Sequence, residues 1–327
     1  MMRLLACALL GVAAELDLAA DQALTEELKA LVGQEQHWPR GEEIPSPNDR
    51  TWQVWDTCRD PGFTEQLRKN QTRVQVRAVH VEVIEWLVRH HRDHPRRAQF
   101  VESIGHRLLQ LGVVPNIYQW SELLNEELSS FPVLDHSWQS IPWPGVLSAL
   151  RWLEGNFTDR LLPAFELAKQ KQLFNEHPEG LHLTGYWETA YVWQGGCKVD
   201  VYPKVCELLK AIYRAWPTKR GIQEARFARM HPKTLVVDHT ADTNQRIKIH
   251  CGIENPSNVT MHIANVSVTW QPGRCVLVDD SYAHHISTSE SDLPRTILEL
   301  KVSHPDLATA PSLDEDGRVK RKARREL

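Results

Sequence analysis

The sequence has few cysteines, no C-x-x-C pair and no excess of basic residues. Six cysteines in 327 residues are too few for a fold that depends on a disulfide framework, and without a C-x-x-C pair we do not expect a zinc ribbon. The net charge of −4 argues against general nucleic-acid binding, which usually needs a basic face, so no nucleic-acid partner is expected. The basic run from Arg318 to Arg325 is an exception that we interpret as a solvated tail.

The sequence also lacks internal repeats and low-complexity blocks, and the apolar run at its start is short. This run, from Leu4 to Val12, follows Arg3 and precedes two alanines, and it is too short to cross a bilayer. The layout is typical of a secretory signal peptide over residues 1–14, whereas the alternative is the first turns of a buried helix. We therefore expect no transmembrane helix in the mature chain.

Two further features favour the secretory pathway, and a cysteine pair would suit its oxidising environment. Asn-x-Ser/Thr glycosylation acceptors occur four times, at Asn70, Asn156, Asn258 and Asn265. The chain ends in Arg-Arg-Glu-Leu, which loosely resembles an ER-retention signal. Cys197 and Cys206 bracket a short proline-containing stretch and could form a disulfide in an oxidising compartment. We expect a location in the endoplasmic reticulum lumen, or in the cytoplasm if the N-terminal apolar run belongs to a helix.

The first part of the chain is predicted to be helical. From residue 20 to about residue 130 apolar side chains recur at helical spacing, most clearly over Val74–His91 and Ala98–Leu111. The stretch Phe131–Trp143 contains prolines and tryptophans and is the best candidate for a linker. After this linker, Val146–Phe174 is again predicted to be helical.

The second part of the chain is predicted to consist of short strands after one more helix at Val205–Trp216. The predicted strands are Arg226–Met230, Leu235–Asp238, Arg246–Ile253, Val259–Ile263, Val266–Thr269, Cys275–Val278 and Arg295–Val302. Many short strands at this spacing favour a double-sheet jelly roll. The expected fold class is therefore α+β, with a helical region over 20–130, a cupin-like jelly roll over 131–307 and a basic tail over 308–327.

Two histidines follow strands of this predicted barrel. His239 comes directly after Leu235–Asp238, and His284 follows Cys275–Val278 across a short polar stretch. Two strand ends of a jelly roll can meet at one mouth although 45 positions separate the histidines. Two imidazoles with a carboxylate or water form the ligand set of non-haem Fe(II), which keeps positions open for a cosubstrate and dioxygen.

The carboxylate of the usual facial triad is missing from this pattern. It would stand two residues after His239, where the sequence has Ala241, and Asp242 is one residue further on. Either two histidines and water hold the metal, which we favour, or Asp242 substitutes.

The strand Arg246–Ile253 has a basic face. Arg246, Lys248 and His250 point to one side, whereas the isoleucines at the alternate positions form the core side. Burying these cations without anions would be costly, so a ligand with carboxylates would satisfy them, unless the face is simply wet. Arg295 opens the last strand, eleven residues after His284, and could clamp a dicarboxylate, although alone it would be interpreted as a surface charge.

These residues together resemble a known family. The motifs are Met230-His231-Pro232, His239-Thr240, Thr243-Asn244, Arg246, His250, Trp270, Gly273, Asp279-Asp280-Ser281, His284, Arg295 and His304-Pro305-Asp306-Leu307. Their order and spacing resemble the aspartyl/asparaginyl β-hydroxylase family over about residues 112–307. The resemblance implies a double-stranded β-helix, Fe(II), 2-oxoglutarate and O2, and hydroxylation of Asp or Asn side chains in a polypeptide substrate.

The resemblance also implies roles for single residues. His239 and His284 match iron ligands of a family that lacks the triad carboxylate. Arg295 matches the arginine that pairs with the distal carboxylate of 2-oxoglutarate, and His250 matches a histidine near that cosubstrate. Arg246 matches a basic residue close to the substrate. The family's animal members have a disulfide between cysteines that resemble Cys197 and Cys206.

The sequence departs from the family at three positions. Lys248 stands in place of an arginine, so its expected contact with the cosubstrate is that of a point charge. Ala228 replaces a serine that helps to hold 2-oxoglutarate, and Ala241 replaces a glycine beside the metal. Two alternatives therefore stay open: the same chemistry on a lipid or small molecule, and a jelly-roll binding module without catalysis.

Overall fold

The computed structural model describes residues 112–121, 123–134, 141–177, 181–218, 221–256, 258–288 and 291–309, together with single residues or pairs between 73 and 109. The chain divides into two compact units, Met1–Leu124 with Leu313–Leu327, and Asn125–Ser312. The expected signal peptide, most of the expected helical region and residues 310–327 of the basic tail lie outside the described residues. In the first unit, the described residues from Val101 to Leu109 are helical, as predicted, and Gly112 follows with a φ of 67°.

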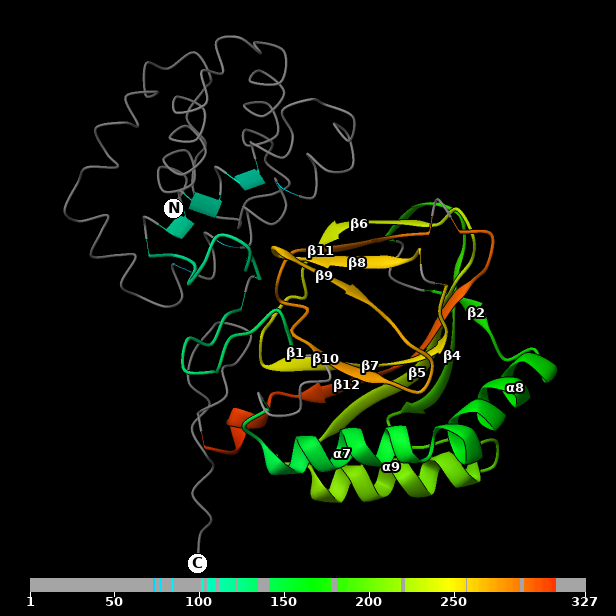
Figure 1. The fold of residues 1–327 in the computed structure, drawn as a ribbon. Coiled ribbons are helices and arrows are strands. Elements are labelled where there is room, and N and C mark those ends of the chain that lie inside the picture. The colour runs from blue at the N-terminus through cyan, green and yellow to red at the C-terminus, as the bar shows by residue number, and fades with distance from the viewer. Residues whose placement is uncertain are drawn as a thin grey trace, which may run out of the picture. The chain divides into compact units, whose positions relative to one another are not determined.

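The second unit contains two antiparallel sheets that face each other (Figure 1). The larger sheet has the strand order β1-β10-β7-β12-β5-β4-β2 and the smaller one the order β3-β6-β11-β8-β9. The strands are β1 Val133–Leu134, β2 Asn175–Glu176, β3 His182–Thr184, β4 Trp187–Gln194, β5 Ile222–Met230, β6 Leu235–His239, β7 Arg246–Glu254, β8 Thr260–Ile263, β9 Val266–Thr269, β10 Cys275–Val278, β11 His284–Ser287 and β12 Arg295–Ser303. The predicted cupin-like jelly roll is therefore confirmed for this unit.

The helices of this unit cover the outer face of the larger sheet (Figure 1). They are α7 Pro144–Gly155, the π-helical turn η5 Phe157–Leu161, α8 Leu162–Gln170, α9 Pro203–Ala215 and the 3-10 turn η6 Pro305–Ala308. The apolar sides of α7 and α9 pack against alternate residues of β5 and β12, such as Phe227 and Leu298. Because strand side chains alternate between faces, the remaining residues of these strands point between the two sheets and line the interior.

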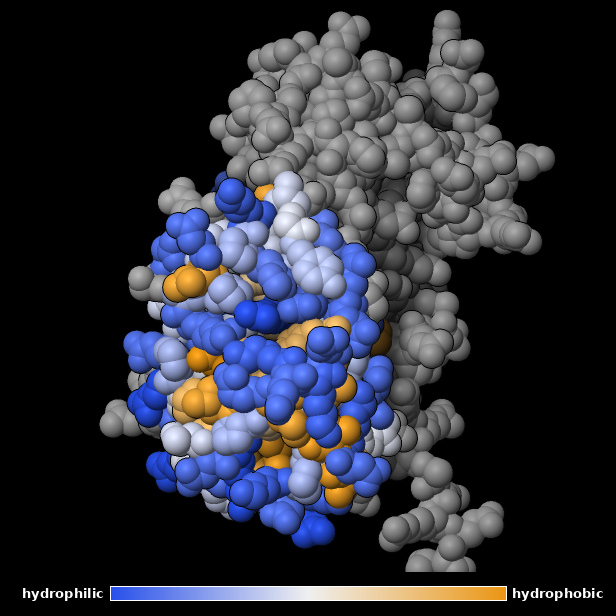
Figure 2. Space-filling model, turned by 90° about the vertical axis from the view of Figure 1, so that its right-hand side faces the viewer, coloured by the Kyte–Doolittle hydropathy of each residue, from blue (hydrophilic) through white to orange (hydrophobic). Residues whose placement is uncertain are grey.

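Several charged side chains lie in this interior, among them Arg226, Arg295 and Glu299. Figure 2 shows one face of the unit, on which hydrophilic residues separate several apolar patches. The large apolar residues exposed in the second unit's described part are Trp152, Tyr186, Val199, Tyr213, Val266 and Leu293. No helix among the described residues is both long and apolar enough to span a membrane.

All seven predicted strands are present, with ends that differ by at most four residues from the prediction. Val133–Leu134, within the expected linker, pairs with β10 as an edge strand, because this edge offers unpaired backbone groups. One prediction is wrong. The helix predicted over Val146–Phe174 is interrupted after Gly155, where Asn156 ends α7 and a π-helical turn follows.

Both pairs among the four described cysteines are disulfide-bonded. Cys197 is joined to Cys206, the pair that the sequence and the resemblance suggested. Cys251 is joined to Cys275, directly opposite each other on β7 and β10, a pairing that the sequence did not reveal because it depends on the register of two distant strands.

We expect the double substitution Cys251→Ala with Cys275→Ala to lower the free energy of unfolding by about 3 kcal/mol, because the disulfide restricts the unfolded chain. Cys197→Ala with Cys206→Ala should cost less, since that disulfide closes a sequence separation of 9 instead of 24. Urea unfolding of both variants under oxidising conditions measures the difference. Equal midpoints for the wild type and the Cys251/Cys275 variant would contradict the prediction.

Candidate metal centre

His239 and His284 lie side by side on the inner face of the smaller sheet. His239 ends β6 and His284 begins β11, and the two are direct partners in the antiparallel register, with ring centroids 4.1 Å apart. In each ring, Nδ1 lies 2.8 Å from the backbone oxygen of the residue two positions earlier, Val237 or Tyr282. When Nδ1–H donates to a carbonyl, the lone pair is on Nε2, which is the form of histidine that binds a metal ion.

The surroundings keep His284 neutral. Its side chain is almost fully buried, and burial together with the neighbouring His239 holds the pKa of His284 well below its usual value. Within the described ranges no group of three or more His, Cys, Asp or Glu side chains is arranged to hold a metal. The chemistry of the donor pair His239 and His284 would fit Fe(II) with water or ligand oxygens in the other positions.

Asp242 does not complete a triad. Its carboxylate is exposed and forms an ion pair with Arg246. At the position where a triad carboxylate would stand, the backbone N–H of Ala241 donates to the backbone oxygen of Asp280 at 2.6 Å. Of the two alternatives left open by the sequence, the arrangement agrees with the one in which water completes the metal shell.

Arg295 is the buried cation whose donors are least satisfied. Only 1% of it is exposed, its Cζ lies 3.6 Å from the ring centroid of Trp270, and its Nη1 contacts the sulfur of Met230 at 3.9 Å. Its Nε and Nη2 have no hydrogen-bond partner among the residues that the structure describes. Burial lowers the pKa of Arg295 to about 9, so the guanidinium is charged at neutral pH. A buried guanidinium edge of this kind fits a carboxylate that accepts two parallel hydrogen bonds.

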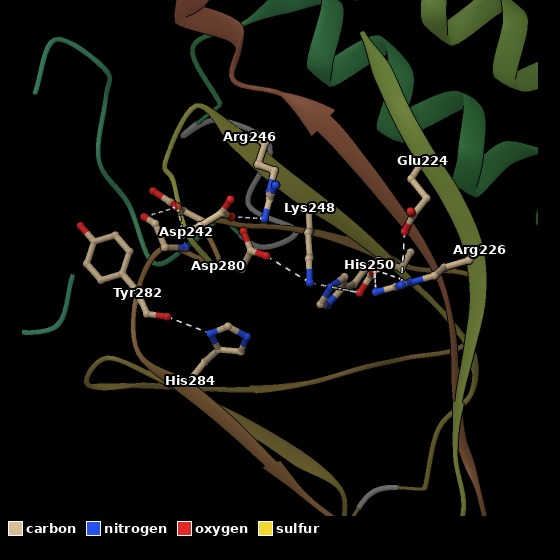
Figure 3. A network of polar contacts seen from close by, with 12 residues as sticks. Glu224, Arg226, Asp242, Arg246, Lys248, His250, Asp280, Tyr282 and His284 are labelled. Carbon is tan, nitrogen blue, oxygen red and sulfur yellow. Dashed lines mark hydrogen bonds and ion pairs between the residues drawn. The ribbon is translucent and has the colours of Figure 1, made fainter. Parts of the chain in front are cut away.

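Two residues of the predicted basic face of β7, Lys248 and His250, are buried. Lys248 Nζ lies 3.1 Å from Asp280 Oδ2 and 3.5 Å from Glu299 Oε2 (Figure 3). His250 Nε2 is also 3.5 Å from Glu299 Oε2, and burial lowers the pKa of His250. The chain itself therefore supplies two anions beside Lys248, the carboxylates of Asp280 and Glu299.

Sequence reasoning missed two residues of this network, Glu299 and Arg226. Arg226 Nε donates to Glu299 Oε1 at 2.8 Å, and Arg226 Nη1 lies 3.3 Å from Glu224 (Figure 3). Glu299 stands four residues after Arg295 on the same predicted strand, and residues at this spacing point to the same face. This spacing could have placed the glutamate on the inner face. Arg246, by contrast, is partly exposed beside Asp242.

Asp279 is a buried carboxyl group in the turn before β11. Its Oδ1 accepts hydrogen bonds from the backbone N–H and the hydroxyl of Ser281, at 3.1 and 2.6 Å. Burial raises the pKa of Asp279 to about 8, with Asp280 adding to the shift. Asp279 is therefore protonated in the folded protein at neutral pH.

We expect Asp279→Asn to stabilise the fold increasingly as the pH rises from about 4 to about 8. In this window the folded carboxyl holds a proton that the unfolded chain releases near its usual pKa of about 3.9, so wild-type stability falls as the pH rises. The asparagine keeps the acceptor for Ser281 and removes this penalty. Urea unfolding of both proteins at about pH 5 and about pH 8 measures it, and a stability difference that does not change with pH would contradict it.

The part of the chain that contains these residues is similar to a known protein family. Residues 162–305 match the family model described as Aspartyl/Asparaginyl beta-hydroxylase, a range that includes both histidines and Arg295. The chain is 33% identical over 144 residues to the Mus musculus aspartyl/asparaginyl beta-hydroxylase, covering 42% of this chain and 19% of that protein. It is 30% identical over 211 residues to the Homo sapiens protein of the same name, covering 58% and 27%.

A shorter human relative is also similar to this chain. The Homo sapiens aspartate beta-hydroxylase domain-containing protein 2 is 31% identical over 172 residues, covering 48% of this chain and 45% of that protein. The chain thus spans less than half the length of each of these curated relatives.

Proposed function

We propose that this chain is an Fe(II)- and 2-oxoglutarate-dependent dioxygenase that hydroxylates Asp or Asn side chains of a polypeptide, because residues 162–305 match the family model described as Aspartyl/Asparaginyl beta-hydroxylase. The observation that carries the proposal is the buried Arg295, whose Nε and Nη2 lack partners among the described residues, in the barrel that also holds the paired histidines. A buried cation with unmet donors is costly unless an anion completes it, and a dicarboxylate cosubstrate would do so.

Each part of the proposed site has a defined task. His239 and His284 would hold the iron through Nε2, because their Nδ1 atoms face backbone oxygens. Arg295, held flat against Trp270, would bind the distal carboxylate of 2-oxoglutarate. The bound iron supplies the chemistry in which 2-oxoglutarate and O2 yield succinate, CO2 and one oxygen atom inserted into a C–H bond. The two packed sheets exclude water from the reacting groups.

The polypeptide substrate is the less constrained part of the proposal. Arg246 is partly exposed and paired with Asp242, so it could exchange this partner for an acidic substrate side chain at the mouth. Two disulfides among the described cysteines are consistent with folding in an oxidising compartment, and acceptors Asn258 and Asn265 are exposed. We therefore propose a secretory-pathway polypeptide as the substrate and the endoplasmic reticulum lumen as the location.

Turnover with defined substrates tests the function. The purified protein is incubated with Fe(II), 2-oxoglutarate and O2, and with either Asp- and Asn-containing peptides or lipid and small-molecule acceptors. The expected result is succinate that forms in step with the addition of one oxygen atom to a peptide, measured by mass spectrometry. Oxygen added only to a lipid or small molecule would replace the substrate class. Folded protein that binds metal but never consumes 2-oxoglutarate would identify a binding module instead.

A further inference from the structure

Lys248 stands between two carboxylates of its own chain. Its Nζ lies 3.1 Å from Asp280 and 3.5 Å from Glu299, and each of the three side chains is at most 10% exposed. At such low exposure the ion pairs are weakly screened, and each charge depends on its partners. The positive charge of Lys248 is therefore already balanced within the barrel.

Glu299 is the centre of this buried network, and the register of three strands places it there. On β12 it is directly opposite Arg226 of β5 on one side and His250 of β7 on the other. Arg226 contacts the same carboxylate through Nε at 2.8 Å and Nη2 at 2.7 Å. Although burial alone raises the pKa of Glu299, Arg226 and Lys248 together keep that pKa well below its usual value. An ionised Glu299 thus anchors Lys248 on the larger sheet.

Asp280 connects the other end of Lys248 to both histidine-bearing segments. Its backbone oxygen accepts the N–H of Ala241, two residues after His239. It also stands four residues before His284 in the turn that leads into β11. Figure 3 shows the resulting line of contacts from Arg226 through Lys248 to Asp280, with His284 beyond.

We propose that Lys248 and Glu299 are positioning residues for the histidine pair, and that Lys248 does not bind the cosubstrate. The inference rests on the proposed function and replaces the contact between Lys248 and the cosubstrate that the resemblance implies. Without Lys248, the buried Asp280 would lose its partner at 3.1 Å and would move or take up a proton. Either change displaces the segments that hold His239 and His284. The backbone oxygen of Asp280 is hydrogen-bonded to Ala241, near His239, and the turn that contains Asp280 leads into β11, which begins at His284.

Separate titrations of metal and cosubstrate test this division of roles. Co(II) replaces Fe(II) as a probe that is stable in air, and its visible absorption reports ligand geometry. In Lys248→Met, we expect Co(II) affinity to fall by about 10- to 100-fold, the usual cost of losing a residue that orients a metal ligand. The affinity for 2-oxoglutarate at saturating Co(II) should stay within about threefold of the wild type. Arg295→Met should show the reverse pattern.

Companion variants separate positioning from a general loss of folding. Glu299→Gln keeps the shape of the side chain and removes its charge, so it should also weaken Co(II) binding. This variant provides the test if Lys248→Met does not fold. Lys248→Arg restores the cation and should recover most of the affinity for Co(II). Lys301→Met is the matched control, because Lys301 is opposite Lys248 in the β7–β12 register and is only half-buried.

The outcomes distinguish this inference from the proposed function. If Lys248→Met raises the dissociation constant for 2-oxoglutarate and leaves Co(II) affinity unchanged, then Lys248 is a cosubstrate ligand and the inference is wrong while the function stands. Unchanged Co(II) affinity in both Lys248→Met and Glu299→Gln would also overturn it. If the folded wild type binds neither Co(II) nor 2-oxoglutarate, the proposed function itself fails.

Discussion

Replacing His284 by alanine is expected to abolish metal binding and to reduce succinate formation to the uncatalysed background. The reason is that His239 and His284 are the whole protein-derived ligand set of the proposed site, so one imidazole alone cannot hold iron against water. Anaerobic titration with Fe(II) and 2-oxoglutarate measures the loss, because the wild type should develop the weak visible charge-transfer band of the chelate and the variant should not.

His285 provides the control for this substitution. It is the next residue on β11, but it points to the other face of the sheet, where its Nδ1 lies 2.8 Å from Asp238 Oδ1 and its ring stacks on that of His262. His285→Ala removes the same number of atoms from the same strand, and it should retain the charge-transfer band and turnover. Retained turnover in His284→Ala, or equal losses in both variants, would remove the case for this metal site.

Replacing Arg295 by methionine is expected to have effects of opposite sign on function and on stability. Loss of a buried, hydrogen-bonded partner of a carboxylate costs about 2–5 kcal/mol of binding free energy, which corresponds to a rise of about 30- to several thousandfold in the dissociation constant for 2-oxoglutarate. Yet the folded protein without ligand should become more stable by about 1–4 kcal/mol, because a buried charge with unpaired Nε and Nη2 is replaced by an apolar chain.

Two measurements check both signs. Titration of 2-oxoglutarate at saturating Co(II) gives the binding loss, and urea unfolding without 2-oxoglutarate gives the change in stability. Arg295→Lys serves as the intermediate case, since it keeps the charge but not the planar edge that a carboxylate would bridge. If Arg295→Met destabilises the ligand-free fold and leaves 2-oxoglutarate affinity unchanged, Arg295 has a structural role and the cosubstrate site must be sought elsewhere.

Much of the fold could be predicted because its signals are local. The alternation of Ile247, Ile249 and Cys251 with polar residues identified the core side of β7, and all three belong to the buried core. The strand β11, His284–Ser287, was missed because it follows a polar turn and has one apolar residue, whereas the equally short Cys275–Val278 is apolar throughout. Its existence depends on β6 and β8, which pair with it on both sides.

The sequence by itself determined which chemical groups this protein brings to the site: two histidines after strands, an arginine that opens the last strand, and a basic inner face on β7. These follow from residue type and from the two-residue period of a strand, and both can be read without knowing the fold. Only the tertiary structure decided which charges are already paired. Lys248, Asp280 and Glu299 come from separate parts of the chain, and their contacts depend on how β7, β10 and β12 are aligned. That alignment places Lys248 beside two carboxylates of its own chain, whereas Nε and Nη2 of Arg295 have no partner among the described residues.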